Sequence, residues 1–390
     1  MLKNKSVLLL MLVVVFLAFG VLGCGQPATP PADDDAVDEP AAEFEGQVIM
    51  GIMLPITGAV AENGIDMENA AKLAVEEINA AGGVLGYEIV TSTGDDGCDP
   101  AMATAAASKL VSEEVFGVVG GYCSGATLPT LKIYGDAGIP IVLAASNSTA
   151  LIDENPGWAF LINSTGDLQA ENAVVQFEKL GVKTIGIIDA GDAYSADVKV
   201  QTTAQWTAKG NEVVMDGTVN PGEQDFSSLV TTIMSINPDG IYWTGYHAEG
   251  GLLVRQLREA GYEGVLMVAD GTSDPAFIEI AGEYGEGVFL TAPPFADLTP
   301  TAQGFAADYR AKYNRDPGAY AGLTYDAVYL LVDAVERAGS FDGAALRDEL
   351  AATANWPGIS GVVTFTEKNT MSTSNFVILV VKDGEWAFAE

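Results

Sequence analysis

Three loops carry the side chains best suited to hold a small polar ligand, and the first of them is Gly120–Ala126. This glycine-rich run follows a predicted strand, opens a predicted helix, and contains Tyr122 and Ser124. Small residues let the backbone approach a ligand closely, and the free amides at the start of a helix favour a carboxylate. The hydroxyl of Ser124 adds a side-chain donor, so the loop is typical of an anion-binding turn.

The other two loops add polar groups of different character. Ala145–Thr149 follows the next predicted strand and includes Ser146 and Asn147, whereas Ala269–Thr272 follows a later strand and includes Asp270. A carboxylate at that position is suited to meet a ligand ammonium. Each loop alone has the composition of an ordinary turn. Their convergence on one cleft would make a binding site.

Catalytic and metal-binding alternatives find little support in the residues. The single histidine, His247, excludes a histidine-rich zinc site. Neither a G-x-S-x-G elbow nor a phosphate-binding P-loop occurs. A nucleophile at Cys123 or Ser124 would have only His247 as a conventional base. Three acids lack the spacing of a calcium loop and are interpreted as turn and cap residues: Asp95, Asp96 and Asp99. We therefore predict a binding protein with no enzymatic activity, metal or cofactor.

The chain is strongly acidic, with 18 Lys+Arg against 53 Asp+Glu and a net charge of -35. Such a surface repels phosphate backbones, which excludes nucleic acid as a partner. A solvated surface, suited to a saline habitat, is the simplest interpretation of the acidity.

Alternating strands and helices must position the three loops. In the first half, the patterns predict strands Val48–Leu54, Tyr87–Thr93, Val115–Gly120 and Ile139–Ala144, and helices Ala101–Val111, Leu128–Ala137 and one whose apolar positions are Met67, Ala70, Ala71, Ala74, Val75 and Ile78. In the second half, they predict helix Ala170–Leu180, then strands Thr184–Ile188, Glu212–Met215, Gly240–Trp243, Val265–Val268 and Val288–Leu290, helices Thr301–Tyr313, Ala321–Ala338 and Gly343–Ala352, and short strands Val362–Thr366 and Asn375–Val381.

This alternation predicts an α/β fold with two doubly wound lobes, each a parallel sheet wrapped by helices. The length of 390 residues is enough for two cores. In open parallel sheets, ligands bind beyond the carboxyl ends of the strands. The predicted site therefore faces the gap between the lobes.

The N-terminus predicts export. An apolar run of thirteen residues, Val7–Phe19, is preceded by two lysines and is shorter than the roughly 20 residues of a membrane span. Val21–Cys24 resembles a lipoprotein lipobox, which makes residues 1–23 a lipoprotein signal peptide and Cys24 the lipidated residue. The alternative is a simple secretion signal with an incidental cysteine.

Residues 24–46 are rich in proline and acids and predict a disordered tether, with the folded body starting near Gln47. The two remaining cysteines, Cys98 and Cys123, would then lie in an oxidising compartment, where we expect a disulfide between them. Two buried free thiols are the alternative.

Five segments resemble the leucine/isoleucine/valine-binding proteins of ABC importers: Gly51–Gly58, Ala80–Gly86, Asp95–Pro100, Pro221–Ser227 and Gly245–His247. The similarity runs from about Gln47 to the C-terminus. It implies a type I periplasmic-binding-protein fold, with two lobes joined by a three-crossing hinge near Asn163, Thr291 and Val363. The first lobe would comprise residues 47–162 plus 293–363, and the second lobe residues 163–292 plus 364–390.

The resemblance also implies roles for the polar site residues. Ser124 and Asn147 would bind the carboxylate and ammonium ends of an amino acid, helped by the backbone of Ala145 and next to Ser146. Asp270 matches the family's acidic partner for the α-ammonium.

Aromatic residues and cysteines match the family as well. Tyr194 and Tyr246 correspond to tyrosines that cover the ligand, and Tyr320 corresponds to an aromatic contact of the ligand side chain. Cys98 and Cys123 match the family's disulfide pair.

Two positions depart from the family pattern. Asn63 stands where the family has an aromatic residue in the side-chain pocket, and Asn147 replaces a threonine. Asn63 leaves the pocket more polar or more open, and Asn147 changes the set of hydrogen-bond donors. An amide, urea or another small solute is therefore an alternative to a branched-chain or other small aliphatic amino acid. A sensor for a separate receptor is a further alternative.

The resemblance implies an extracytoplasmic, lipid-anchored monomer at the cell surface or in the periplasm, which delivers its amino acid to the membrane subunits of an ABC permease.

Overall fold

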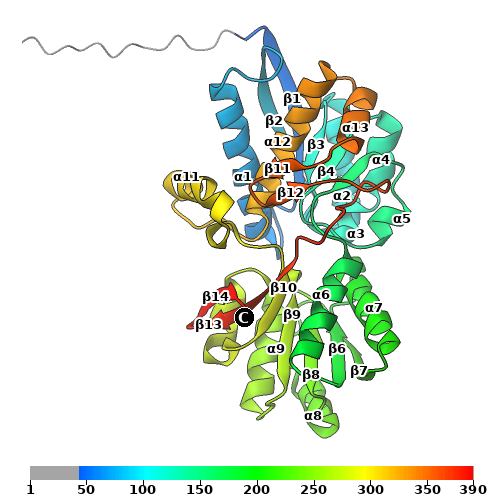
Figure 1. The fold of residues 1–390 in the computed structure, drawn as a ribbon, viewed down its shortest axis with the longest axis vertical. Coiled ribbons are helices and arrows are strands. Elements are labelled where there is room, and N and C mark those ends of the chain that lie inside the picture. The colour runs from blue at the N-terminus through cyan, green and yellow to red at the C-terminus, as the bar shows by residue number, and fades with distance from the viewer. Residues whose placement is uncertain (1–43, 390) are drawn as a thin grey trace, which may run out of the picture. The chain divides into compact units, whose positions relative to one another are not determined.

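The computed structural model describes residues 44–389 (Figure 1). The predicted signal peptide 1–23, the lipidated Cys24 and nearly all of the tether 24–46 lie outside the described residues. Within the described part, no helix is both long and apolar enough to cross a membrane.

A five-stranded parallel sheet organises the first lobe, in the order β2-β1-β3-β4-β5. Its central strands are buried on both faces, which is why their sequences are nearly continuous apolar runs. The strands are β1 (Gly46–Leu54), β2 (Tyr87–Asp95), β3 (Val118–Gly120), β4 (Ile141–Leu143) and β5 (Ala159–Leu161).

Helices cover both faces of this sheet, and they come from both halves of the sequence (Figure 1). The predicted apolar face of α1 is buried, and α1 packs against the later helix α12. Asp99 begins α2 by accepting hydrogen bonds from two backbone amides, as its interpretation as a cap residue predicts. The helices are α1 (Ala61–Ala80), α2 (Pro100–Ser112), α3 (Ser124–Thr127), α4 (Thr130–Ala137), α5 (Ala150–Asp153), α12 (Ala321–Ala338) and α13 (Gly343–Ala351).

A seven-stranded sheet organises the second lobe, in the order β14-β13-β10-β9-β8-β6-β7. Five of its strands are parallel, whereas β13 runs antiparallel to β10 and to β14. The strands are β6 (Thr184–Asp189), β7 (Glu212–Thr218), β8 (Gly240–Trp243), β9 (Val265–Ala269), β10 (Phe289–Ala292), β13 (Val377–Lys382) and β14 (Glu385–Phe388).

The helices that follow β5 through β10 complete the structure. Those that wrap the second sheet are α6 (Gly166–Lys179), α7 (Ala193–Ala208), α8 (Ser227–Ile236), α9 (His247–Glu259), α10 (Ala276–Ala281) and the short turns η1 (Asp270–Thr272) and η2 (Gly282–Gly285). After β10, the chain returns to α1 through η3 (Ala296–Leu298), η4 (Pro300–Ala302) and α11 (Gln303–Tyr313), whose buried residues share a core with Ala70 and Leu73.

Some predicted elements differ in detail. The helix expected around Leu128–Ala137 is α4, which begins after Pro129, and the separate short helix α3 precedes it. The strand expected at Val362–Thr366 is only β12 (Gly361–Val363), which pairs with an unpredicted short strand, β11 (Trp356–Gly358). Each of these two strands has only three residues, which explains why their pattern is weak in the sequence.

The third passage between the lobes falls late in the chain. Phe365 and Met371 pack in the core of the first lobe, and β13 is the next strand to enter the second sheet. Asn375 lies at this passage, where it accepts a hydrogen bond from Ser164 N (3.0 Å) and donates one to Ile162 O (3.1 Å). We therefore propose a crossing between Met371 and β13 rather than near Val363, with the first and third crossings joined by this asparagine.

Candidate ligand-binding site

A small cavity lies beyond the carboxyl ends of strands from both sheets, where the sequence predicts the site. About 220 Å³ of space free of protein atoms lies there, part of it open to solvent. Seven of the predicted site residues line it, together with Gly271. The lining consists of Tyr122, Ala145, Asn147, Tyr194, Tyr246, Asp270, Gly271 and Tyr320.

Asp270 is the charged centre of this cavity. It begins η1 directly after β9 and is only 1% exposed. Its carboxylate accepts hydrogen bonds from Tyr194 Oη (2.5 Å) and Gln169 Nε2 (2.9 Å), and a longer one from Asn147 Nδ2 (3.4 Å). Burial raises the pKa of Asp270, and the hydrogen bonds from Tyr194, Tyr320 and Gln169 oppose that rise. The site thus holds a buried carboxylate that is stabilised by dipoles and lacks a cationic partner.

Gln169 is a member of this network that the sequence interpretation missed. It lies fully buried on α6, donates to Asp270 and to Thr291 Oγ1 (3.1 Å), and accepts from Asn147 Nδ2 (3.1 Å). It therefore connects loops of both lobes. The available signal was a polar residue one position before the predicted apolar face of Ala170–Leu180.

Gly271 was missed as well, and it is a glycine for a steric reason. A Cβ at this position would lie 2.8 Å from Gly245 O and 3.0 Å from the Tyr194 ring. Its amide donates to Tyr194 Oη (2.9 Å). The close approach lets the tyrosine hydroxyl bind both the amide and Asp270.

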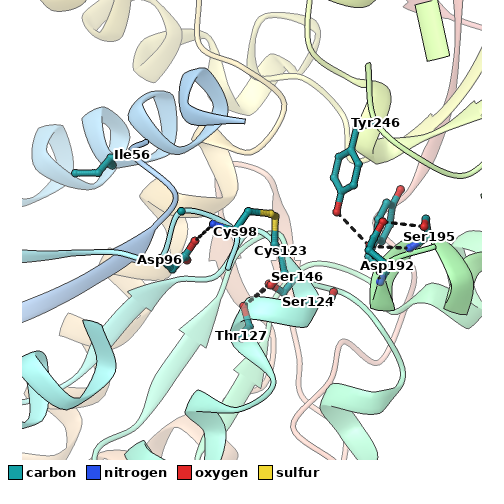
Figure 2. Close-up of a disulfide and its surroundings, with 12 residues drawn as sticks. Ile56, Asp96, Cys98, Cys123, Ser124, Thr127, Ser146, Asp192, Ser195 and Tyr246 are labelled. Atoms are coloured by element: carbon teal, nitrogen blue, oxygen red, sulfur yellow. Dashed lines mark hydrogen bonds between the residues drawn. A yellow bond between two sulfur atoms is a disulfide. The ribbon is translucent and has the colours of Figure 1, made fainter. Parts of the chain in front are cut away.

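Four tyrosines form most of the remaining wall. Tyr122 and Tyr320, which pack in the core of the first lobe, meet edge to face with centroids 5.5 Å apart. Tyr194 and Tyr246 belong to the second lobe, and their centroids are 5.8 Å apart. Figure 2 shows the Tyr246 hydroxyl directed at Asp192, to which it donates (3.3 Å).

Two predicted hydroxyls are not among the cavity-lining residues. Ser124 Oγ accepts hydrogen bonds from the amides of Asn147 (3.3 Å) and Ser148 (3.2 Å), so it joins the two loops. Ser146 Oγ shares a hydrogen bond with Thr127 Oγ1 (2.8 Å), visible in Figure 2. Both serines support the loops that carry the lining residues.

Asn63 also lies outside the cavity lining. It projects from α1 and donates to Asp274 Oδ2 (3.1 Å), which lies just after η1. His247 Nδ1 lies 4.0 Å from the same carboxylate oxygen. Asn63 therefore makes a polar contact between the lobes.

The chain is similar to a known protein family and to individual members of it. Residues 47–385 match the model of a family described as periplasmic binding protein. The chain is 31% identical over 347 residues to the Leu/Ile/Val-binding protein BraC3 of Rhizobium johnstonii, which covers 88% of this chain and 94% of that relative.

The chain belongs to the periplasmic binding protein family.

Other family members agree in sequence and fold. A Pseudomonas aeruginosa protein named for binding leucine, isoleucine, valine, threonine and alanine is 31% identical over 83% of this chain and 87% of its own length. The leucine-binding protein LivK of Thermotoga maritima has a TM-score of 0.82 at 31% identity, covering 88% and 98% of the two chains. LivJ of Streptococcus pneumoniae, solved with isoleucine, has a TM-score of 0.79 at 26% identity, covering 87% and 97%. These similarities confirm the predicted type I fold.

A disulfide supports the first-lobe wall of this periplasmic binding protein. Cys98 and Cys123 are bonded, as predicted, with Cα atoms 5.4 Å apart (Figure 2). The bridge ties the loop after β2 to the residue that follows Tyr122. Beside it, the buried Asp96 accepts a hydrogen bond from Cys98 N (2.8 Å), and burial raises the pKa of Asp96 to about 6.

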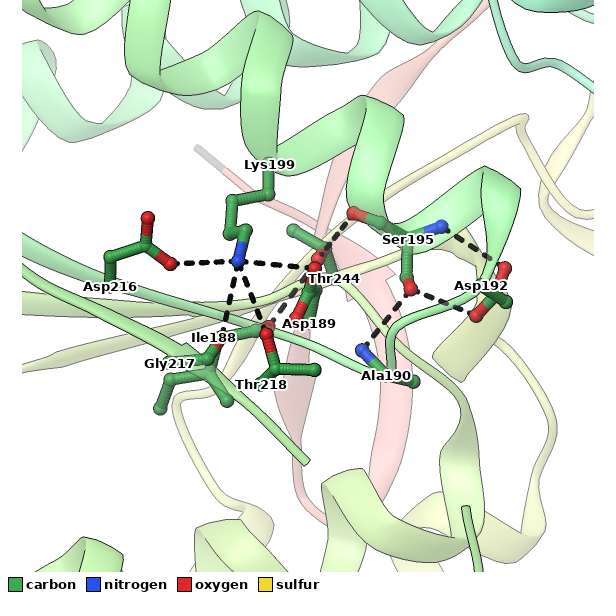
Figure 3. Close-up of polar contacts among 10 residues, drawn as sticks. All are labelled: Ile188, Asp189, Ala190, Asp192, Ser195, Lys199, Asp216, Gly217, Thr218 and Thr244. Carbon is green, nitrogen blue, oxygen red and sulfur yellow. Dashed lines mark hydrogen bonds and ion pairs between the residues drawn. The ribbon is translucent and has the colours of Figure 1, made fainter. Parts of the chain in front are cut away.

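Polar contacts support the second-lobe wall (Figure 3). Asp192 caps α7 by accepting from the amides of Tyr194 (2.9 Å) and Ser195 (3.2 Å). Farther along α7, Lys199 pairs with Asp189 at the end of β6 (3.1 Å) and with Asp216 on β7 (2.7 Å). The helix that carries Tyr194 is thereby held against the sheet.

The charges around the cavity are of one sign. Its lining includes Asp270 and no lysine, arginine or histidine. The charges of Asp270, Asp274 and Asp192 all act on Tyr122, although desolvation is the larger cause of its raised pKa. The described residues contain no group of three or more acids, histidines or cysteines suited to a metal ion. The electrostatics favour a ligand that carries a positive group.

Proposed function

We propose that this chain is the solute-binding component of an ABC importer and captures an amino acid between its lobes. The observation that carries the proposal is Asp270, a buried carboxylate in a cavity without a basic residue. A buried charge is costly unless it is paired. A ligand ammonium supplies that pair.

A second acceptor strengthens the assignment to an ammonium. Asn147 Oδ1 is buried and has no hydrogen-bond partner among residues 44–389, although Asn147 Nδ2 donates to Gln169. An ammonium has three donors and no acceptor, so it matches Asp270 and this amide oxygen. A neutral amide or urea would leave the carboxylate uncompensated.

The α-carboxylate is proposed to meet the loops of the first lobe, near Ala145. Ser124 Oγ accepts two backbone amides there and retains its own proton for donation. Tyr194 and Tyr246 cover the ligand from the second lobe. The names of the relatives, which describe binding of leucine, isoleucine, valine, threonine and alanine, support an aliphatic amino acid.

Binding contributes to transport through closure of the lobes. Asp270 lies in the second lobe and Asn147 in the first, so a ligand that contacts both stabilises the closed arrangement. The equilibrium shifts by the ligand's differential affinity for the closed form. The permease membrane subunits then bind the closed lobes, and no covalent step is required.

The N-terminal sequence supports a location outside the cell membrane for this activity. A signal peptide over residues 1–23 and a lipid on Cys24 would anchor a monomer beside its permease. Anchoring raises the effective concentration of the protein at that partner.

The test is calorimetric titration of the chain without residues 1–23 and with Cys24→Ser, unfolded and refolded to remove carried-over ligand. Amino acids, small amides and urea are titrated into this protein and into Asp270→Ala. We expect an aliphatic amino acid to bind and the alanine variant to lose that binding. Heat from an amide or urea alone would retain the fold and contradict the substrate.

A further inference from the structure

We propose that Tyr122 limits the size of the ligand side chain, so that glycine, alanine and serine bind well and leucine and isoleucine bind poorly. This inference rests on the proposed function, because it concerns the side chain of an amino acid held by Asp270. It assigns the selectivity to one aromatic ring rather than to the charged residues.

The ring of Tyr122 forms part of the cavity wall. Tyr122 is 8% exposed, lines the cavity with Ala145, and packs edge to face on Tyr320. The polar groups of Asp270 and Asn147 belong to the hydrogen-bond network with Gln169. A ligand whose ammonium lies at that network directs its side chain at the aromatic rings.

The backbone on both sides of Tyr122 is held in place. Gly121 has φ of +73°, and a Cβ there would lie 2.6 Å from the side chain of Leu143, so this turn is tightly packed. On the other side, Cys123 is bonded to Cys98. The ring therefore has little freedom to withdraw from a larger ligand.

A polar contact outside the cavity lining holds the lobes together near Tyr122. Asn63 Nδ2 donates to Asp274 Oδ2 (3.1 Å), and Asn63 is 9% exposed. Asp274 lies near enough to Tyr122 for its charge to act on the phenol. A ligand that held the lobes farther apart would break this contact and leave both groups without a partner, which is costly.

Each additional carbon of the ligand side chain is expected to lower the affinity modestly, and these losses add up along a longer side chain. A pocket distinguishes ligands that differ by one methylene by about 10–200-fold. Leucine exceeds alanine by three carbons, so even a partly adaptable wall should give an alanine-over-leucine affinity ratio of at least about 10.

The experiment measures the affinities of glycine, alanine, serine, valine, leucine and isoleucine by calorimetry. The proteins are the ligand-stripped chain, Tyr122→Leu, and Tyr122→Phe as the matched control, which keeps the ring and removes the hydroxyl. We expect alanine to bind at least about 10-fold more tightly than leucine in the unsubstituted chain and in Tyr122→Phe. In Tyr122→Leu, the ratio should fall at least about 10-fold or reverse.

Two results would overturn the inference while leaving the proposed function intact: leucine binding as tightly as alanine in the unsubstituted chain, or a ratio unchanged in Tyr122→Leu. Binding of none of the amino acids to any of the three proteins would overturn the proposed function and this inference with it. Because the readout is a ratio within one protein, a general loss of stability does not mimic the expected result.

Discussion

The charged and the aromatic sides of the cavity are built in different ways. The charged side combines Asn147 of the first lobe with Gln169 and Asp270, so its hydrogen bonds cross between lobes. The rings of the aromatic pair, Tyr122 and Tyr320, pack in the core of the first lobe, although the side chain of Tyr320 also hydrogen-bonds to Asp270. The charged side is therefore completed by closure, whereas the aromatic pair persists when the lobes separate.

This difference separates two tasks. A preformed apolar wall can reject a ligand by shape before closure. The charged network supplies the differential affinity that closure requires. Perturbations of the two sides should consequently change different observables.

The largest effect is expected from removal of the disulfide, which supports the aromatic side. Replacement of Cys98 and Cys123 by serine should lower the free energy of unfolding by about 3 kcal/mol, because the bridge restricts the unfolded chain. Chemical denaturation measures this loss. The alanine-over-leucine affinity ratio should also fall, since the Tyr122 backbone is freed. Reductant serves as the control, because it should change the unsubstituted chain and leave the serine variant unaffected.

A smaller effect is expected from Gln169, which positions Asp270 and Asn147. Gln169→Leu removes the donor to Asp270 and should weaken amino acid binding by about 10-fold, corresponding to about 1.4 kcal/mol for a lost hydrogen bond. Calorimetry at matched pH measures it. The alanine-over-leucine ratio should stay constant, and a change in that ratio without a change in alanine affinity would break the distinction between the two sides.

The smallest effect is expected from a change of pH, which should act in opposite directions on folding stability and on ligand affinity. The pKa of Asp96 is raised from 3.8 to about 6, so the folded state holds its proton more tightly than the unfolded state does. The Asp96 carboxyl therefore adds on the order of 1 kcal/mol to the free energy of unfolding below about pH 4. This contribution is lost as the pH rises through 6. The Tm should therefore rise on acidification from pH 7 to pH 5.

Acidification should act against binding, because the raised pKa of Asp270 makes its carboxylate easier to protonate. Two other buried carboxyls, Asp66 and Asp326, also have pKa values of about 6 and add to the stability trend. Asp96→Asn should reduce the rise of Tm on acidification and leave the pH dependence of ligand affinity unchanged. Parallel losses of Tm and affinity on acidification would contradict this prediction.

The sequence predicted the parts of the site that depend on local pattern. Tyr122, Asn147 and Asp270 follow buried strands, and the carboxyl ends of such strands meet at one edge of a sheet. Gln169 was missed because it lies within a helix, and only tertiary packing turns its side chain toward the site. The positions where the chain crosses between the lobes are harder to predict from the sequence for a related reason.

At the third crossing, the chain stays with the first lobe through contacts that have no periodic pattern. Thr370 bridges to Leu161 of β5, and Phe365 bridges to Met371, so residues 365–371, which follow Val363, still contact the first lobe. Ser124 and Ser146 illustrate a second limit of pattern reading. Their hydroxyls suit a ligand by type, and each also bonds to a neighbouring loop, a role that the sequence pattern does not indicate.

The most direct test of the central role of Asp270 compares two ligands that differ only at one group. Alanine and lactate share their methyl and carboxylate groups, and lactate carries a hydroxyl where alanine carries the ammonium. Calorimetric titration of both into the ligand-stripped chain and into Asp270→Asn measures what the carboxylate contributes. We predict at least about 100-fold tighter binding of alanine in the unsubstituted chain, with most of that preference lost in Asp270→Asn, because breaking a buried charge pair costs about 3–5 kcal/mol. Equal affinities for alanine and lactate in the unsubstituted chain would contradict the assignment of Asp270 as the ammonium-binding residue.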